Sequence, residues 1–385
     1  MRAALERGRV VELASSAATG GLPLTLLVND AHRFTATRDF LDVFFELLDG
    51  GHGRGPVTRL RGLVAAGTHV ASAAEKLEHE ERAFGSWRDR FESIAWHDAA
   101  AADQIRDVGG YRFHHWMAEG GCYLACGSVE PHYFAGAAGA HKTLTVGVMA
   151  RESIEANHAG AMSPDARGLC LAGNPVHEGI AGALAALDRH GARMLAVNQV
   201  LVDGRVVAAA AGAPLTALEE ALVVARGCFG HALSAPVDVV VAQMEPPLDR
   251  DVYQADKGIK NTESVVRDGG VLILEALCEQ GVGIDHFVQL LSRAPTHDAA
   301  LEIVRERGYR LGDHKAVRLR ALTDGRGVRL AIVSPNIDPA MAPVLGATVH
   351  RDRKVAAAWA ASVLPAGGAQ GVLVEDAGNV TLELA

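Results

Sequence analysis

The stretch LTLLVNDAHRFTATRDFLDVFFELLDGG, residues 24–51, decides the fold class of this 385-residue chain. Residues 24–28 are an apolar run of the length of a buried strand. Residues 38–51 carry apolar side chains at helical spacing and close on glycine, the residue that most often follows the end of a helix. A buried strand that leads through a polar loop into an amphipathic helix is the building unit of α/β folds with parallel sheets.

The same alternation recurs along the chain and predicts two lobes. Further strand-like runs lie at 60–67, 123–129, 143–149, 236–243, 271–277 and 329–336, and helical patterns at 71–90, 176–191 and 215–226. Residues 195–212 are typical of a hairpin that turns at Asp203-Gly204, and residues 371–384 of a terminal hairpin around Ala377-Gly378. We therefore predict an α/β protein of two lobes, each a mostly parallel sheet flanked by helices, with the active site in the cleft between them. The domains are residues 1–228 and 229–385, and the last strands are candidates for docking back on the first domain.

Composition excludes several functional classes. With 37 Lys and Arg against 46 Asp and Glu, the net charge of −9 disfavours nucleic acid as a partner. No apolar run approaches the length of a membrane-spanning helix, and the N-terminus lacks the pattern of a signal peptide. Five cysteines without a repeated spacing indicate buried thiols rather than a disulfide framework. We expect a cytoplasmic protein that binds neither membranes nor nucleic acid.

Histidines, of which the chain has 17, follow several predicted strands. Asp30 and Arg33 follow the first strand, His69 the second, His97 a third and His132 a fourth. A single loop histidine is usually only solvated, but the carboxyl ends of parallel strands meet at one edge, where α/β proteins bind their ligands. Because histidine is the commonest acid/base catalyst, the pattern favours an active site.

Two further segments carry candidate ligand-binding residues. In EPHYFAGAAGAHK, residues 130–142, Gly136 and Gly139 allow the backbone to approach a ligand, and Lys142 adds a cation or a nucleophilic amine. A nucleotide-binding phosphate loop is disfavoured, because histidine precedes this lysine where that motif needs glycine. In VYQADKG, residues 252–258, Gln254 and Lys257 are three residues apart and share one helical face.

These segments together resemble the nickel-dependent lactate racemase family, whose members include related 2-hydroxyacid racemases and epimerases. The similarity is colinear over residues 27–257 and rests on VNDAHR, AAGTH, EPHYFAGAAGAHK, His158, GNPVHE and YQADKG. It implies an isomerase that depends on a nickel-pincer nucleotide, in which nickel is bound to pyridinium-3-thioamide-5-thiocarboxylic acid mononucleotide. The cofactor is tethered through Lys142, and separate biosynthesis proteins are partners because they must make it.

The resemblance also implies a role for each matching residue. His69 and His132 correspond to the catalytic acid/base pair, and His158 to the protein ligand of nickel. The residues implied near the cofactor are Lys142, Asp30, Arg33, Gly136 and Gly139, and those near the substrate are Arg33, Tyr253, Gln254 and Lys257. One histidine takes the hydroxyl proton while hydride leaves the α-carbon, a 2-keto acid forms, and the other histidine serves the opposite face.

Departures from the family pattern bear on the substrate. His32 stands where threonine is common, and the LGDHKAV segment offers His314 and Lys315 in the region of a tryptophan of the lactate enzymes. These side chains favour a 2-hydroxyacid larger or more polar than lactate. Two alternatives stay open: a zinc-dependent hydrolase, which needs three converging ligands, and a non-catalytic carrier of the pincer nucleotide, which needs no acid/base pair.

Overall fold

A computed structural model describes residues 1–50, 59–365 and 367–385 and divides the chain into two compact units. Unit 1 comprises Met1–Glu130, Ala137–Asn157 and Leu171–Cys228, and unit 2 comprises Pro131–Gly136, His158–Cys170 and Phe229–Ala385. Two short segments from within the range 1–228 thus belong to unit 2, so neither unit is one continuous stretch of chain. Among the described residues, no helix is long and apolar enough to cross a membrane.

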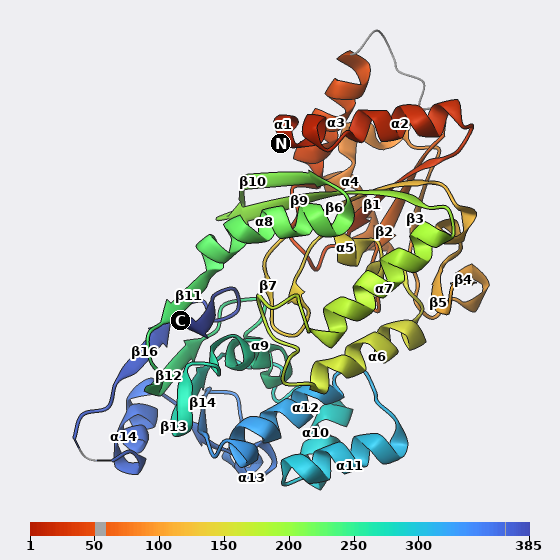
Figure 1. Cartoon of the computed structure of the whole chain (residues 1–385). Coiled ribbons are helices and arrows are strands. Elements are labelled where there is room, and N and C mark those ends of the chain that lie inside the picture. Colours follow the sequence, from red (N-terminus) through yellow and green to blue (C-terminus); the bar gives the residue numbers. More distant parts are fainter. Residues whose placement is uncertain (51–58, 366) are drawn as a thin grey trace. The chain divides into compact units, whose positions relative to one another are not determined.

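Unit 1 is built on a six-stranded sheet in the order β10-β9-β6-β1-β2-β3 (Figure 1). Its strands are β1 (Leu24–Asn29), β2 (Leu60–Ala65), β3 (Ser93–Trp96), β6 (Cys122–Ser128), β9 (Arg193–Val202) and β10 (Arg205–Gly212). All neighbours are parallel except β9 and β10. Every residue of β1 and β6 is buried, as expected for central strands covered on both faces.

Helices and short elements complete unit 1. The helices are α1 (Arg2–Arg7), α2 (Val10–Thr19), α3 (Thr37–Gly50), α4 (Ala73–Ala83), α5 (Ala140–Thr143), α6 (Arg151–Ala159, whose last two residues belong to unit 2), α7 (Pro175–Arg189) and α8 (Pro214–Phe229, whose last residue belongs to unit 2). The short strands of unit 1 are β4 (Ile105–Val108) and β5 (Tyr111–His114). Before α5 come β7 (Pro131–His132), which belongs to unit 2, and β8 (Gly136–Ala137), of which Ala137 alone belongs to unit 1. An aromatic core of Phe40, Phe44 and Phe45 from α3 packs with the apolar residues of β1 and β6.

Several predictions for unit 1 are confirmed. The strand at 24–28 is β1, and the helix that ends at Gly50 is α3, although Gly51 lies outside the described residues. The hairpin of β9 and β10 turns at Asp203-Gly204, where both residues have positive φ, 49° and 72°. That backbone conformation matches a tight turn to the twist of the two strands.

Two other predictions for unit 1 are wrong. The helix expected over 71–90 ends at Ala83 and continues as 3-10 turns over Gly85–Arg90, because Gly85 has a φ of +42° that an α-helix cannot contain. The strand expected over 143–149 is instead the end of α5 and a 3-10 turn. Its neighbour β6 already pairs with β1 on one side and β9 on the other, so the sheet has no free edge there.

Unit 2 is built on a five-stranded parallel sheet in the order β15-β14-β13-β12-β16. The strands are β12 (Val237–Gln243), β13 (Val266–Glu275), β14 (Arg329–Val333), β15 (Ala347–His350) and β16 (Gly371–Val374), with the separate parallel pair β11 (Gly230–Leu233) and β17 (Thr381–Leu384). The strands predicted at 236–243, 271–277 and 329–336 are confirmed. The terminal hairpin is wrong: β16 pairs with β12 and β17 with β11, both within unit 2.

The helices of unit 2 cover its sheet and hold the larger apolar core. They are α9 (Val252–Thr262), α10 (Asp285–Arg293), α11 (His297–Arg307), α12 (Asp313–Arg320), α13 (Ala342–Leu345) and α14 (Arg353–Val363). Helices α9, α10 and α12 supply core residues such as Ile259, Phe287 and Val317, which pack with β12, β13 and β14. The helix α14 packs in a smaller cluster with β13 and β14 through Ala356 and Ala360.

Candidate active site

The ends of β1 and β2 bring Asp30 and His69 into direct contact in unit 1. The two strands are parallel neighbours whose last residues, Asn29 and Ala65, are paired, so the loops that follow leave the same edge of the sheet. Oδ2 of Asp30 lies 2.8 Å from Nδ1 of His69 and 3.1 Å from Nδ1 of His32. The predicted convergence of strand-end residues is therefore present for Asp30 and His69.

The carboxylate of Asp30 is buried, with only 6% of its side chain exposed. Burial alone raises the pKa of Asp30, but the hydrogen bond to His69 and the charges of His69 and His32 outweigh burial and leave this pKa below its usual value. Asp30 is thus an anion at neutral pH. An anionic acceptor holds the proton of His69 on Nδ1 and leaves Nε2 as the basic nitrogen.

Arg33 lies in the same loop and is engaged by a carboxylate. Its Nη1 donates to Oε1 of Glu130, which follows β6, over 3.0 Å, and both side chains are about one-third exposed. An ion pair so exposed to solvent is weak, so a ligand carboxylate can replace Glu130 as the partner of the Arg33 guanidinium.

The glycine-rich segment of unit 1 leads into a buried lysine. Gly139 begins α5 with a φ of +147°, and a Cβ there would lie 3.0 Å from Oδ1 of Asn198, which accepts a hydrogen bond from the N–H of Ala140. Position 139 therefore requires glycine, because of its positive φ and because a Cβ would crowd Asn198. Lys142 lies on α5 with only 9% of the residue exposed. The earlier glycine, Gly136, has a φ of +78° and belongs to unit 2.

Buried polar atoms without hydrogen-bond partners surround this part of unit 1. Both ring nitrogens of His141, Nδ1 of His177 and Nδ2 of Asn198 have no partner among the described residues. The two imidazole rings are 5.7 Å apart, and burial lowers the pKa of each, so both are neutral. Buried polar groups are normally paired. Unpaired groups around a buried primary amine fit a polar ligand attached at Lys142.

In unit 2, His132 is held by its own backbone and by two aromatic rings. The N–H of Ala135 donates to Nδ1 of His132 over 3.3 Å. The imidazole stacks on Tyr133 at 5.4 Å and meets Phe134 edge-on at 4.5 Å. Since Nδ1 accepts a hydrogen bond, the neutral ring carries its proton on Nε2, the tautomer opposite to that of His69.

His158 ends α6 and also lies in unit 2 beside these rings. The ring of Phe134 is 4.9 Å from the ring of His158 and 4.9 Å from that of His314. His314 is buried between two tyrosines: Nε2 lies 3.2 Å from the hydroxyl of Tyr133 and Nδ1 lies 2.7 Å from that of Tyr309. Both nitrogens of His314 are therefore engaged, and the ring packs beside Phe134 as a structural residue.

The first turns of α9 carry the residues implied near the substrate. Asp251 caps the helix by accepting from the N–H of Gln254 over 2.6 Å. Tyr253 is packed tightly, because a Cβ at Gly312 would lie 2.6 Å from its hydroxyl oxygen. Lys315 donates to the carbonyl of Tyr253 over 2.5 Å and sits 4.3 Å from the centre of its ring. Burial, with the charge of nearby Lys257, lowers the pKa of Lys315 to about 8.

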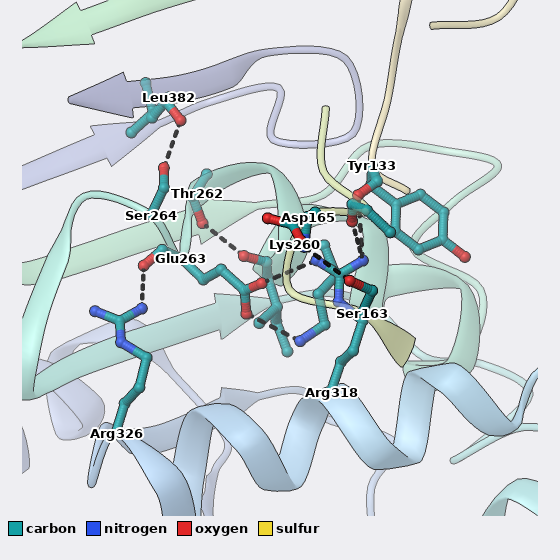
Figure 2. A network of polar contacts seen from close by, with 12 residues as sticks. Tyr133, Ser163, Asp165, Lys260, Thr262, Glu263, Ser264, Arg318, Arg326 and Leu382 are labelled. Atoms are coloured by element: carbon teal, nitrogen blue, oxygen red, sulfur yellow. Dashed lines mark hydrogen bonds and ion pairs between the residues drawn. The ribbon is translucent and has the colours of Figure 1, made fainter. Parts of the chain in front are cut away.

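Figure 2 shows the polar network that holds the two short segments of unit 2. The guanidinium of Arg318 donates to the carbonyl of Tyr133 over 3.3 Å and to that of Ala166 over 2.9 Å. Glu263 accepts from Arg318 over 3.2 Å and from Lys260 over 2.9 Å. One buried cation therefore fixes the backbone beside His132 and the segment that follows His158.

Other polar residues singled out in the sequence have structural roles. Nε2 of His97 lies 2.8 Å from the carbonyl of Met149, and burial lowers the pKa of His97 to about 4. The GNPVHE segment is a helix start, in which Asn174 accepts from the N–H groups of Val176 and His177 at 3.1 and 3.4 Å. Helix capping explains the position of Asn174, and the hydrogen bond to Met149 explains that of His97.

Sequence reasoning missed several residues of the site. The pairing of His32 with Asp30 had a signal, since the two are close in sequence and follow a strand. The network of Arg318, Glu263 and Lys260 had none, because only tertiary packing brings α9 and α12 to the segments they hold. Asp256, which is buried with both oxygens unpartnered among the described residues and has a raised pKa through burial, was also unrecognised.

Comparison with known proteins identifies relatives for both units. Residues 2–168 match the lactate racemase N-terminal domain and residues 233–311 the lactate racemase C-terminal domain. A lactate racemase of Thermoanaerobacterium thermosaccharolyticum is 25% identical over 307 residues, 76% of this chain and 68% of the relative. One of Lactiplantibacillus plantarum is 28% identical over 250 residues, 62% of this chain and 56% of the relative.

Two solved structures share the fold. The lactate racemase apoprotein of Thermoanaerobacterium thermosaccharolyticum matches with a TM-score of 0.85 at 22% identity, over 99% of this chain and 92% of that one. A protein of Thermotoga maritima matches with a TM-score of 0.67 at 16% identity, over 98% of each chain. The predicted α/β class with two mostly parallel sheets is confirmed.

Proposed function

The chain belongs to the lactate racemase family, and from that premise we propose that it racemises or epimerises a 2-hydroxyacid with a nickel-pincer nucleotide tethered to Lys142. It is an isomerase that acts on a lactate-like substrate. The observation that carries the proposal is the 2.8 Å hydrogen bond between Asp30 and His69, which makes a surface histidine an oriented base at a strand end.

The residues around Lys142 and His158 fit the proposed cofactor. Lys142 offers a buried primary amine for the covalent tether, and unpaired polar atoms of His141 and Asn198 lie in the same unit. His158 offers an imidazole, a donor that suits nickel(II). When bound, the nucleotide would supply the hydride acceptor and donor for the α-carbon, with a 2-keto acid as the oxidised substrate.

His69 is assigned the hydroxyl proton of one enantiomer. Asp30 accepts from Nδ1 and leaves the lone pair of Nε2 available, so the ring takes the proton at Nε2. The resulting imidazolium is stabilised by the buried carboxylate. Because half of the His69 side chain is exposed, a substrate hydroxyl can reach it without rearrangement of unit 1.

His132 is assigned the hydroxyl proton of the opposite enantiomer. The backbone N–H of Ala135 and the rings of Tyr133 and Phe134 fix the plane of the imidazole. In its neutral form Nε2 carries the proton and can donate to an oxygen of the substrate. The two histidines are thus held as opposite neutral tautomers. His132 takes a hydroxyl proton in the tautomer that frees Nε2, in which Nδ1 carries the proton and no longer accepts from Ala135.

The substrate carboxylate has two proposed binding groups. Arg33 presents a planar fork suited to a bidentate carboxylate and would exchange Glu130 for the substrate. On α9, Lys257 adds a cation and Gln254 an amide, one turn apart. These assignments locate charge near the substrate without assigning a proton-transfer role to either side chain.

We further propose that the natural substrate is larger or more polar than lactate. Lys257 and Lys315 are near enough for each ammonium to disfavour the other, and Lys315 is buried against Tyr253. Lys315 also lies near the carboxylates of Asp256 and Asp251, which favour its ammonium. A 2-hydroxydicarboxylic acid or a sugar acid would place an additional polar group, which lactate lacks, beside these two lysines. His314 contributes shape rather than a contact, since both nitrogens already meet tyrosine hydroxyls.

The test is stereochemical turnover by protein made together with cofactor-biosynthesis enzymes. Each enantiomer of lactate, malate and glycerate is incubated separately, and the product is resolved by chiral chromatography. We expect racemisation that is abolished by His69→Gln and by His132→Gln but not by the exposed control His190→Gln. Intact mass should place an added group on Lys142, which is absent from Lys142→Arg.

Two results would refute parts of this proposal separately. Full turnover by His69→Gln would refute the acid/base role of His69 and leave the family membership unchanged. Racemisation by protein whose Lys142 carries no added mass would refute the proposal that the cofactor is tethered to Lys142. A substrate panel in which lactate is by far the best substrate would refute the proposed preference for larger acids.

A further inference from the structure

A triad of possible metal ligands is formed by Asp30, His32 and His69 at the ends of β1 and β2. One ligand atom from each lies within 4.8 Å of the others. We propose that this triad binds a divalent cation of borderline softness, zinc above all, at a site separate from the nickel ligand His158. The binding follows from the triad itself, and its effect on catalysis rests on the proposed function.

The distances suit a tetrahedral ion. In such a site, metal bonds of about 2.0–2.2 Å to nitrogen and oxygen place neighbouring ligand atoms roughly 3.3 Å apart. Oδ2 of Asp30 is 2.8 Å from Nδ1 of His69 and 3.1 Å from Nδ1 of His32. The two imidazole rings lie 4.2 Å apart at 36° to one another. These two distances are within about 0.5 Å of that spacing. A water would complete the four ligands of the ion.

The charges also favour a cation. Asp30 supplies a buried anion, and two imidazoles in their neutral form supply donors without positive charge. Glu75 of α4 adds a second carboxylate near His32: hydrogen bonds from Ser72 are the main cause of its lowered pKa, and the charge of His32 contributes. Arg33, the cation nearest in sequence, is paired with Glu130.

The triad is open to solvent on the side of the histidines. The side chains of His32 and His69 are 49% and 50% exposed, whereas that of Asp30 is 6% exposed. An ion can therefore enter from solution and displace the Nδ1 protons of the two rings. Deprotonated Nδ1 is the required ligand form in both rings.

Occupation of the triad would stop His69 from acting as a base. The metal would take the place of the Nδ1 proton that His69 now donates in its hydrogen bond to Asp30. The neutral metal-bound ring would carry its proton on Nε2, which leaves no lone pair to accept the hydroxyl proton. His32 then has a distinct role, since it contributes to the cation site but makes no contact assigned to the substrate. Zinc at this triad would inhibit turnover reversibly, and chelation would restore it.

The test uses the full chain made without nickel or cofactor and stripped with a chelator. Cobalt(II) serves as the probe, because its visible absorption reports a bound four-coordinate ion, and zinc is then used to displace it. We expect one site that His32→Thr weakens at least tenfold. His231→Thr, which alters an exposed histidine on β11, is the matched control and should bind as wild type does.

Cobalt binding that is equal in wild type, His32→Thr and the control would overturn the proposal, as would the absence of a site tighter than about 100 µM. His32→Gln, which retains length and polarity but is a poor ligand, guards against a folding defect in the threonine variant. Circular dichroism confirms that each variant is folded.

A second arm measures zinc inhibition of the cofactor-loaded enzyme. Wild type should be inhibited at a zinc concentration at least tenfold below that needed for His32→Thr. If the chain has no racemase activity, the cobalt titration still decides whether the triad binds metal. If the titration shows no site that depends on His32, the proposed racemase function is still tested by the turnover assay. The metal-binding proposal and the proposed racemase function can therefore be refuted independently.

Discussion

Replacing Arg318 by methionine tests whether one buried cation holds the active-site segments of unit 2. Methionine keeps an unbranched side chain of similar length and removes the guanidinium. The change deletes hydrogen bonds to the carbonyls of Tyr133 and Ala166 and the ion pair with Glu263. Both carbonyls lie on the short segments, Pro131–Gly136 and His158–Cys170, that contain or follow His132 and His158.

The magnitude follows from burial. Only 9% of the Arg318 side chain is exposed, against 18% for Glu263. Removing one partner of a buried ion pair typically costs about 3–5 kcal/mol, because the other charge stays behind without compensation. Glu263 retains its 2.9 Å bond to Lys260, so we expect the lower end, about 3 kcal/mol. With roughly 2–4 °C per kcal/mol for a domain of this size, Tm should fall by about 6–12 °C.

Scanning calorimetry measures the loss, and Arg353→Met is the matched control. Arg353 is exposed and pairs with Glu275 and Gln243, so its loss should cost under about 1 kcal/mol. Hydrogen exchange should rise at Pro131–Gly136 and His158–Cys170 in Arg318→Met alone. A variant that melts no lower than the control, with unchanged exchange in both segments, would refute the positioning role of Arg318.

Three further predictions follow from burial and charge. As pH falls from 7.5 to 5, the free energy of unfolding should fall by about 2 kcal/mol for each of His97 and His114. The unfolded rings bind protons below their ordinary pKa of 6.5, whereas the folded rings, with pKa values of about 4 and about 3, do not. Urea unfolding measures this dependence on pH, and His97→Gln should reduce it. Asn174→Ala should cost about 1 kcal/mol in the same assay, because two N–H groups at the start of α7 lose their cap. Lys315→Met should raise KM for a 2-hydroxydicarboxylic acid more than KM for lactate. In wild type, KM for the dicarboxylic acid should rise above pH 8, because the ammonium of Lys315 loses its proton. An equal effect of the substitution on both substrates would refute a role of Lys315 in selectivity.

The parts of the fold that could be predicted are those with a strong local period. The strand and helix at 24–50 repeat their apolar residues at spacings that only one element satisfies, and Asp203-Gly204 specifies its turn by the φ values it allows. Residues 143–149 are apolar without a decisive period. Whether they form a strand depends on a free sheet edge, and β6 offers none.

The site divides in the same way. The convergence of Asp30 and His69 could be predicted, because neighbouring parallel strands bring their carboxyl ends to one edge. The support of the segment of His132 by unit 2 could not be predicted, because Arg318, which donates to the carbonyl of Tyr133, lies 185 residues away in the chain. Local pattern gives the chemistry of a side chain, but which unit supports that side chain is a property of long-range packing.

The two proposed bases have unlike surroundings, and this has a consequence for turnover. His69 donates from Nδ1 to an anion, which stabilises its protonated form, whereas Nδ1 of His132 accepts from a backbone N–H, which does not. The two histidines should therefore accept the hydroxyl proton at unequal rates, and kcat should differ between the two enantiomers. Enantiomers have equal free energies, so kcat/KM must be equal in the two directions of a racemase, and KM must differ by the same ratio as kcat. Asp30→Asn should bring that ratio towards one, because a neutral amide no longer stabilises the imidazolium of His69. Equal kcat values for the two enantiomers in wild type, unchanged by Asp30→Asn, would mean that the hydroxyl proton does not limit the rate at either histidine.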